Sequence, residues 1–149
     1  MSRFSVETGA EISEATGQHS LALELVNRSS SRCFFRGYPR VVLRDENGVI
    51  PFRISHRGDQ MVTSRPPTRV VVGRGHAAYV LVNNYRCDLG VARTARTLRI
   101  SVAGAPANDA ASLLISSRRR PMYCGRGDPG SILAVSPFEP TLRATLKHS

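Results

Sequence analysis

Residues 70–83 read VVVGRGHAAYVLVN, and this stretch decides the fold class. Three valines form a short apolar run, the Gly-Arg-Gly that follows predicts a turn, and residues 76–83 form a second apolar run. If residues 76–83 are a β-strand, their side chains alternate between two faces, and both faces are apolar. We therefore expect a strand that lies in the middle of a sheet and is covered on both sides.

Short apolar runs with a period of two occur along most of the chain. They cover residues 4–6, 21–25, 98–102 and 131–135, and each predicts a strand. Residues 108–117 suit a short helix or a strand, and we favour the strand. About seven to nine short strands, with no long helical period, predict an all-β fold built as an antiparallel β-sandwich.

A hairpin is expected over residues 41–54. The sequence Asp-Glu-Asn-Gly at residues 45–48 is typical of a turn, and apolar residues flank it on both sides. Pro51 cannot donate a hydrogen bond to a neighbouring strand, so the second strand of this hairpin should lie at a sheet edge or contain a bulge. A polar loop containing prolines follows over residues 55–68.

The composition is that of one globular domain. The chain has 149 residues, of which 41% are hydrophobic and 21% charged, so disordered, collagen-like and coiled-coil classes are excluded. This length favours a single domain over residues 1–149. No apolar stretch of about 18 residues could span a membrane, and residues 1–20 are too polar and acidic for a signal peptide. If the protein is exported, we expect its targeting segment to be absent from this chain.

The net charge of +10 is the feature of the composition that bears on function. All but one of the 21 Lys and Arg residues are arginine, which makes nucleic acid, anionic glycans and anionic lipids candidate partners. A GC-rich genome would give the same bias without any ligand, and we favour that explanation. Residues 1–31 are acidic on balance, so we expect them to attract the basic remainder of the chain.

Arg118, Arg119 and Arg120 form the only run of arginines and are the candidate anion-binding residues. Guanidinium groups can bind one oxyanion through two hydrogen bonds, and such binding weakens steeply with salt. Nucleic acid is a less favoured partner, because Tyr123 is the only aromatic residue near the run that could stack on a base. The structural alternative, which we favour, is a solvated loop.

The chain has three cysteines, Cys33, Cys87 and Cys124. They form no C-x-x-C pair and no histidines accompany them at zinc-binding spacing, so we expect a disulfide and one further thiol rather than a metal site. A disulfide favours an oxidising compartment. Motifs of serine hydrolases, zinc proteases and nucleotide-binding loops are missing, so we expect no enzyme, no catalytic residue and no cofactor. The one catalytic alternative is a cysteine nucleophile, with Cys33 and His76 as the pair.

Residues 33–41 read CFFRGYPRV, and a strand and a turn follow up to Gly48. This pattern of a cysteine, three residues, Gly-Tyr-Pro and a valine-containing strand resembles a family of actinobacterial cell-envelope proteins catalogued as domain of unknown function 4232. The resemblance covers nearly the whole chain. It implies an immunoglobulin-like β-sandwich behind a signal peptide or a lipoprotein anchor, with no assigned enzymatic activity.

The resemblance also implies a pattern of disulfides. Family members carry a cysteine just before the first strand, where this chain has Met-Ser-Arg at residues 1–3. By that pattern Cys87 pairs with Cys124 and stabilises the fold by about 3 to 4 kcal/mol. The partner of Cys33 is then missing, and its thiol is unpaired.

Gly37, Tyr38 and Pro39 form the sharpest local motif. We expect a structural role, because glycine and proline shape the backbone and a tyrosine at a sheet corner can bury its ring while its hydroxyl bonds to the backbone. The alternative is that the Tyr38 ring contacts a ligand beside Phe34 and Phe35.

The triplet Arg-Gly-Asp occurs twice, at residues 57–59 and 126–128. It is an adhesion signal in secreted animal ligands, but glycine and aspartate are also common in turns. We expect both triplets to be loops rather than receptor-binding sites.

These patterns predict a non-catalytic binding or interaction domain that is secreted or attached to the actinobacterial cell envelope. Its partner is expected to be an unidentified envelope or extracellular ligand, with membrane contact only through a removed anchor. The alternative is a basic domain that binds polyanions through the arginine run.

Overall fold

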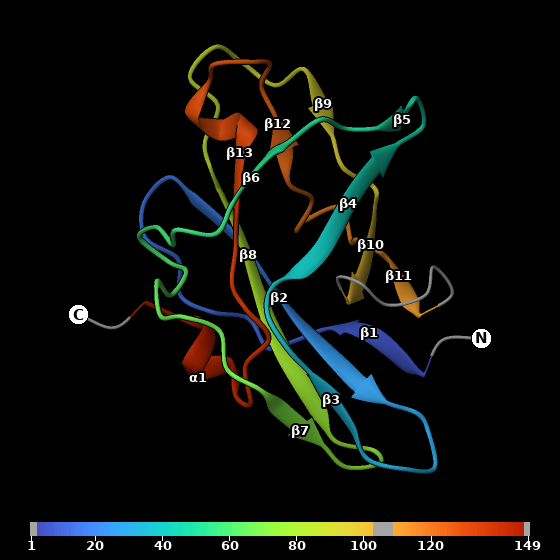
Figure 1. Ribbon diagram of the computed structural model, residues 1–149. Helices are drawn as coiled ribbons and strands as arrows, with labels where there is room; N and C mark the ends of the chain where they lie inside the picture. Colours follow the sequence, from blue (N-terminus) through green and yellow to red (C-terminus); the bar gives the residue numbers. More distant parts are fainter. Residues whose placement is uncertain (1–2, 103–108, 148–149) are drawn as a thin grey trace.

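The computed structural model describes residues 3–102 and 109–147, and most of its regular structure is β (Figure 1). Two sheets form the body of the molecule. The five-stranded sheet has the order β1 (Phe4–Thr8), β2 (Gln18–Asn27), β8 (Ala77–Tyr85), β13 (Ile132–Val135) and β6 (Arg53–Ser55). The four-stranded sheet has the order β11 (Ala110–Leu114), β10 (Thr97–Val102), β4 (Pro39–Asp45) and β5 (Gly48–Val49). The all-β sandwich predicted from the sequence is confirmed.

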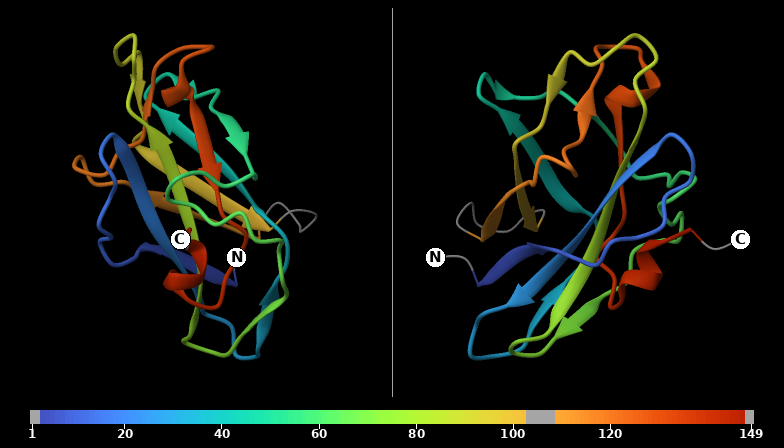
Figure 2. Two further views of the ribbon diagram at one scale, coloured as in Figure 1. Left: turned by 90° about the vertical axis from the view of Figure 1, so that its left-hand side faces the viewer. Right: turned by 180° about the vertical axis from the view of Figure 1, so that it is seen from behind.

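Two small ribbons lie toward opposite ends of the sandwich. One pairs β3 (Cys33–Phe35) with β7 (Val70–Val72), and the other pairs β9 (Arg93–Thr94) with β12 (Met122–Tyr123). Figures 1 and 2 show the β3–β7 ribbon at one tip of the molecule and the β9–β12 ribbon toward the other. We call the first tip the ribbon end and the second, which holds Cys87 and Cys124, the disulfide end.

β8 lies in the middle of the five-stranded sheet, as residues 76–83 predict. It pairs antiparallel with β2 over nine residue pairs and with β13 on its other side. Val80 is fully buried in the main core, and Leu81, on the opposite face of the strand, packs in a second cluster with Met61 and Val62. Both faces of the strand are apolar because both are covered.

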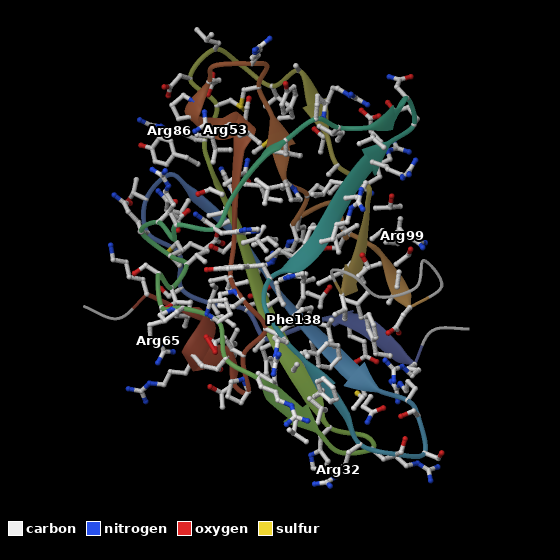
Figure 3. All side chains as sticks on the ribbon, viewed as in Figure 1. Arg32, Arg53, Arg65, Arg86, Arg99 and Phe138 are labelled. Atoms are coloured by element: carbon white, nitrogen blue, oxygen red, sulfur yellow. A yellow bond between two sulfur atoms is a disulfide. The ribbon has the colours of Figure 1, made fainter. Side chains whose placement is uncertain are left out.

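Aromatic rings fill part of the main core. The ring centroid of Phe35 lies 5.5 Å from that of Phe4 and 4.9 Å from that of Phe138, which Figure 3 labels. Leu98 and Ile100 of β10 are fully buried in the same core. Each such side chain stabilises the fold by about 1.5 to 3 kcal/mol relative to an exposed one.

The hairpin predicted over residues 41–54 is only partly formed. β4 pairs with the two-residue strand β5, but the chain then leaves the four-stranded sheet. Pro51 has no N–H to continue the ladder, and β6 pairs instead with β13 in the five-stranded sheet. Instead of one continuous strand, this part of the chain therefore contains two short edge strands, β5 and β6, in different sheets. The β6–β13 pair is also the one parallel pair among the described strands.

Two short helical elements are missing from the sequence-based expectation. α1 (Leu142–Thr145) begins after Thr141, whose hydroxyl accepts a hydrogen bond from the Ala144 N–H. The 3-10 turn η1 (Pro129–Ser131) precedes β13. β11 is the strand favoured for residues 108–117, of which Asn108 lies outside the described residues. Within the described part of the chain, no helix is long and apolar enough to cross a membrane.

Candidate functional site

A disulfide between Cys87 and Cys124 joins two loops at the disulfide end. Cys87 follows β8, Cys124 follows β12, and their Cα atoms are 5.4 Å apart. This is the pairing that the family resemblance implies. Gly130 packs against the bridge, because a Cβ atom at that position would lie 2.5 Å from Cys124 Sγ and 2.8 Å from the Tyr85 carbonyl oxygen. The bridge holds the two loops together, and Gly130 lets them lie close because glycine has no Cβ atom.

Asp128 joins the same two loops by hydrogen bonds. Its carboxylate is buried and accepts from the N–H groups of Asp88 at 3.1 Å, Leu89 at 2.9 Å and Gly130 at 2.9 Å. These bonds, the one from Gly130 foremost, hold the pKa of Asp128 below its usual range. An ionised carboxylate is therefore part of the structure that fixes this end of the molecule.

A hollow of about 310 Å³ opens beside these loops. Arg53 of β6 and Arg126 line it, together with Tyr123 and Ile132. Both arginines are exposed, and neither guanidinium forms an ion pair or hydrogen bond with a residue that the structure describes. Figure 3 labels Arg53 at this end of the molecule. The hollow thus presents two unpaired cations next to an aromatic ring.

The Tyr123 ring is supported by contact with a second aromatic ring. It packs edge to face on Phe52, with the ring centroids 5.4 Å apart, and it is half-buried. Asp128 also lines the hollow, but its carboxylate is already bound by backbone N–H groups. The hollow is therefore chemically suited to a carboxylate, phosphate or sulfate that carries an organic group able to pack on the ring.

A second hollow of about 570 Å³ adjoins the first at Ile132 and is lined by polar residues such as Gln18 and Asp59. The Asn83 amide donates hydrogen bonds to the Gln18 side chain at 2.8 Å and to the Asp59 carboxylate at 2.7 Å. No arginine lines this hollow. Its polar groups are largely bonded to each other, which makes it a weaker candidate site than the first hollow.

Both Arg-Gly-Asp triplets form turns whose aspartates are used inside the protein. Asp59 accepts two backbone hydrogen bonds at 2.8 Å, and Asp128 accepts those described above. Gly58 and Gly127 have φ angles of 79° and 89°, a conformation that favours glycine. The turns account for the glycine and the aspartate of each triplet, and a receptor that bound either carboxylate would have to break these bonds.

The arginine run does not present three free guanidinium groups. Arg119 lies 2.6 Å from a carboxylate oxygen of Glu11 and 3.6 Å from one of Glu14, and Arg120 donates to a backbone carbonyl at 3.2 Å. Arg118 is exposed and forms no ion pair or hydrogen bond with a described residue, but its charge acts on the Glu11 carboxylate. Arg119, the middle residue of the candidate anion site, is therefore already paired with carboxylates of the acidic first segment.

The Gly-Tyr-Pro motif makes structural contacts. Gly37 has a φ of 78°, and its carbonyl accepts a hydrogen bond from the Phe138 N–H at 3.1 Å. The Tyr38 ring stacks on His56 with the centroids 4.0 Å apart, and its hydroxyl donates to the His56 carbonyl at 3.2 Å. Pro39 is buried at the start of β4. The motif thus links the start of β4 to the loop after β6 and to the core.

Cys33 is the free cysteine and is buried in β3. Burial raises the pKa of its thiol, which keeps the thiol protonated and a poor nucleophile. The positive charge of Arg3, one residue before β1, lowers the pKa of this thiol, but by less than burial raises it. The resemblance places a further cysteine within the segment that here reads Met-Ser-Arg at residues 1–3, and residues 1–2 of this segment lie outside the described residues. In the part of the chain that the structure describes, no group of three or more His, Cys, Asp and Glu side chains could hold a metal ion.

Sequence patterns missed the residues that line the basic hollow. Arg53 becomes a neighbour of Ile132 only because β6 pairs in parallel with β13, and no local signal predicts that pairing. The sequence marks Arg126 only as part of an Arg-Gly-Asp triplet, and Tyr123 only as a neighbour of the arginine run. The only sequence signal available is the excess of arginine over acidic residues.

The fold and its disulfide define a disulfide-linked β-sandwich with a basic hollow at one end. Residues 2–139 match the family described as Domain of unknown function (DUF4232), and the chain belongs to this family. No curated protein and no solved structure matches the chain.

Proposed function

We propose that the protein is a non-catalytic binding domain of the actinobacterial cell envelope, and that the hollow between Arg53 and Arg126 receives the anionic group of its ligand. The observation that carries this proposal is the combination of two unpaired guanidinium groups and the Tyr123 ring in one hollow. Guanidinium groups donate paired hydrogen bonds to carboxylate, phosphate and sulfate oxygens. Tyr123 would pack on the organic part of the ligand.

The loops around the hollow are fixed before any ligand arrives. The Cys87–Cys124 bridge and the buried carboxylate of Asp128 hold the loop after β8 against the turn that carries Arg126. A site that is already ordered loses less conformational entropy on binding than a flexible one. This supports a binding function for the hollow.

The proposed location and the lack of catalysis have separate support. A disulfide fits an oxidising compartment, whereas secretion, a lipoprotein anchor and an actinobacterial source rest on the family resemblance. The catalytic alternative needs a reactive Cys33 thiol, but that thiol is buried and its pKa is raised. The β-sandwich fold alone does not identify the function, because one fold hosts many functions.

Acidic sugars and sugar phosphates are the ligand class that we propose. They combine the anionic group that the arginines would bind with a ring that can pack on Tyr123. A neutral sugar lacks the anion, and inorganic phosphate lacks the ring, so each should bind more weakly than a molecule with both.

The test is a titration of the isotope-labelled protein, followed by nuclear magnetic resonance. Glucuronate and glucose 6-phosphate are the probes, and glucose and inorganic phosphate are the controls. We expect the two probes to shift the amide signals of Arg53, Tyr123 and Arg126, and expect these shifts to shrink as salt is added. The double variant Arg53→Gln, Arg126→Gln should lose them, whereas Arg40→Gln, which removes an exposed arginine of β4, should keep them. Equal shifts in the double variant and the unmodified protein would contradict the proposal.

A second candidate function is polyanion binding. It is favoured by the arginines on the exposed face of β4, where Arg40 and Arg44 have no ion-pair partner among the described residues. Retention on a heparin column, with elution at high salt, would support it. Elution at low salt would contradict polyanion binding and would not affect the proposal of a small anionic ligand.

A further inference from the structure

The β3–β7 ribbon carries an exposed apolar pair at the ribbon end. Phe34 lies directly opposite Val71 in the antiparallel pairing, and the two residues are 55% and 52% exposed. The other side chains of the two strands are buried in the main core: Cys33, Phe35, Val70 and Val72. One face of the ribbon therefore belongs to the core, and the opposite face places apolar side chains in solvent.

Arginines surround this pair. The guanidinium carbon of Arg69 lies 4.3 Å from the centre of the Phe34 ring. Arg32 and Arg36 stand two residues before and two residues after Phe34, so strand alternation places them toward the same face. Both are exposed and have no ion pair or hydrogen bond with any residue that the structure describes. Figure 3 labels Arg32 at the tip of the molecule.

No carboxylate in these segments offsets the charge. Residues 29–44 and 60–87, which contain both strands of the ribbon, include no aspartate and no glutamate. The arginine run is different, because Glu11 and Glu14 lie within ion-pair distance of Arg119. The positive charge of the ribbon is thus available to an external partner.

A shallow hollow of about 480 Å³ combines the two kinds of side chain. Arg32 and Arg69 line it together with Phe34 and Val71. Anionic lipid headgroups can pair with arginines, while aromatic and aliphatic side chains enter the boundary between headgroups and acyl chains. We propose that the ribbon end docks on an anionic lipid surface, with Phe34 and Val71 inserted and the arginines on the headgroups.

Other occupants fit the same surface less well. A soluble polyanion would pair with the arginines but would leave the exposed faces of Phe34 and Val71 in water. A second copy of the chain docked on the same face would place its unpaired arginines next to those of the first copy, and these like charges would repel each other. The combination of apolar and cationic side chains therefore favours a lipid surface.

Docking through the ribbon would leave the basic hollow free. The ribbon end and the disulfide end lie at opposite tips of the sandwich (Figures 1 and 2). The hollow would then point away from the membrane, toward ligands in the surrounding envelope. The two proposals use different arginines, so each can fail without the other.

The first experiment measures binding of the full chain to sedimented vesicles. We expect binding to vesicles of equimolar phosphatidylcholine and phosphatidylglycerol and little binding to phosphatidylcholine alone. The triple variant Arg32→Gln, Arg36→Gln, Arg69→Gln should lower the partition coefficient on the order of 100-fold, given the usual contribution of each arginine near an anionic surface. The matched control replaces three exposed arginines that belong to neither proposed site with glutamine: Arg57, Arg86 and Arg143. Equal losses in the triple variant and its control, or no binding by the unmodified protein, would overturn the proposal.

The second experiment tests insertion and does not depend on net charge. The chain contains no tryptophan, so Phe34→Trp introduces a single fluorescent reporter at the proposed contact. Its emission should shift to shorter wavelength when the anionic vesicles are added, and brominated lipid should quench it. Leu114→Trp is the control, because Leu114 is 74% exposed on β11 of the four-stranded sheet. An unchanged spectrum for Phe34→Trp, or the same shift at both positions, would show that the ribbon does not insert. Circular dichroism of each variant checks that it is folded.

Discussion

The Leu89 backbone N–H donates a hydrogen bond of 2.9 Å to the carboxylate of Asp128, 39 residues further along the chain. The Leu89 side chain is 84% exposed, so apolar packing contributes little to the position of its loop. The loop is held instead by backbone hydrogen bonds to Asp128 and by the disulfide at Cys87. The geometry of the disulfide end therefore rests on the Asp128 carboxylate together with the disulfide.

Replacing Asp128 with alanine should loosen this end of the molecule. The variant loses every hydrogen bond that the carboxylate accepts and leaves backbone N–H groups without a partner in the protein. We expect a lower Tm and faster hydrogen exchange at the amides of Asp88 and Leu89, with little change in the four-stranded sheet.

Asp128→Asn is the matched variant, because its amide oxygen can still accept part of these bonds. It should fall between the unmodified protein and Asp128→Ala. Unchanged exchange rates at Asp88 and Leu89 in the alanine variant would mean that the disulfide alone holds the loop.

The Asp45–Arg93 pair should make stability depend on acid pH. Arg93 donates to both carboxylate oxygens of Asp45, at 2.6 and 2.8 Å, and this bonding lowers the pKa of Asp45 to about 2. A carboxyl whose pKa is lower in the folded state stabilises the fold at all pH values above its unfolded pKa, about 3.9. That contribution is lost as the pH falls from about 4 to about 2.

Urea unfolding of the unmodified protein and of Asp45→Asn measures this contribution. The difference in unfolding free energy should be largest at neutral pH and should nearly vanish around pH 2. Glu46→Gln is the control, since the Glu46–Arg96 pair has side chains 63% and 57% exposed and exposed pairs contribute little. A difference that stays constant with pH would indicate that Asn disturbs the β4–β5 turn by its shape rather than by its charge.

The disulfide should supply a large share of the stability. Replacing Cys87 and Cys124 with serine should lower the unfolding free energy by about 3 to 4 kcal/mol, because the unfolded chain regains the freedom that the closed loop removes. Urea unfolding with and without reductant measures the same quantity on the unmodified protein.

Thiol labelling gives an independent check of the pairing. Cys33 is buried, so iodoacetamide should modify it slowly in the native protein and fully after unfolding without reductant. Cys87 and Cys124 should remain unmodified in both cases. A native peptide map in which Cys33 is bridged to either of the other cysteines would refute the pairing.

Local patterns were sufficient to predict the strands that form the centre of the sandwich. The apolar alternation on both faces of residues 76–83 follows directly from the burial of β8, so the sequence carries the signal within one segment. The turn that begins at Asp45 and the edge position implied by Pro51 are also predicted from neighbouring residues alone. Such features can be predicted because each one depends on neighbouring residues.

The candidate site depends on contacts between distant segments. The parallel β6–β13 pairing sets Arg53 opposite Ile132, and no pattern within either strand indicates it. The sequence does predict attraction between the acidic first segment and the basic remainder, but not that Glu11 meets Arg119 in particular. For this reason the sequence indicates the arginine run as the candidate anion site, whereas the structure brings Arg53 and Arg126 together in the basic hollow.

The variant Tyr38→Phe distinguishes a structural role of the Gly-Tyr-Pro motif from a role in ligand binding. The change removes the hydroxyl that donates to the His56 carbonyl at 3.2 Å but keeps a ring that can stack on His56. We expect a loss of about 0.5 to 1.5 kcal/mol in unfolding free energy, and a larger loss for Tyr38→Ala, which also removes the stacked ring. Glucose 6-phosphate and vesicle binding should be unchanged in Tyr38→Phe, because Tyr38 lines neither the basic hollow nor the hollow on the ribbon. Unaltered stability together with lost binding of either probe would instead make Tyr38 a contact residue.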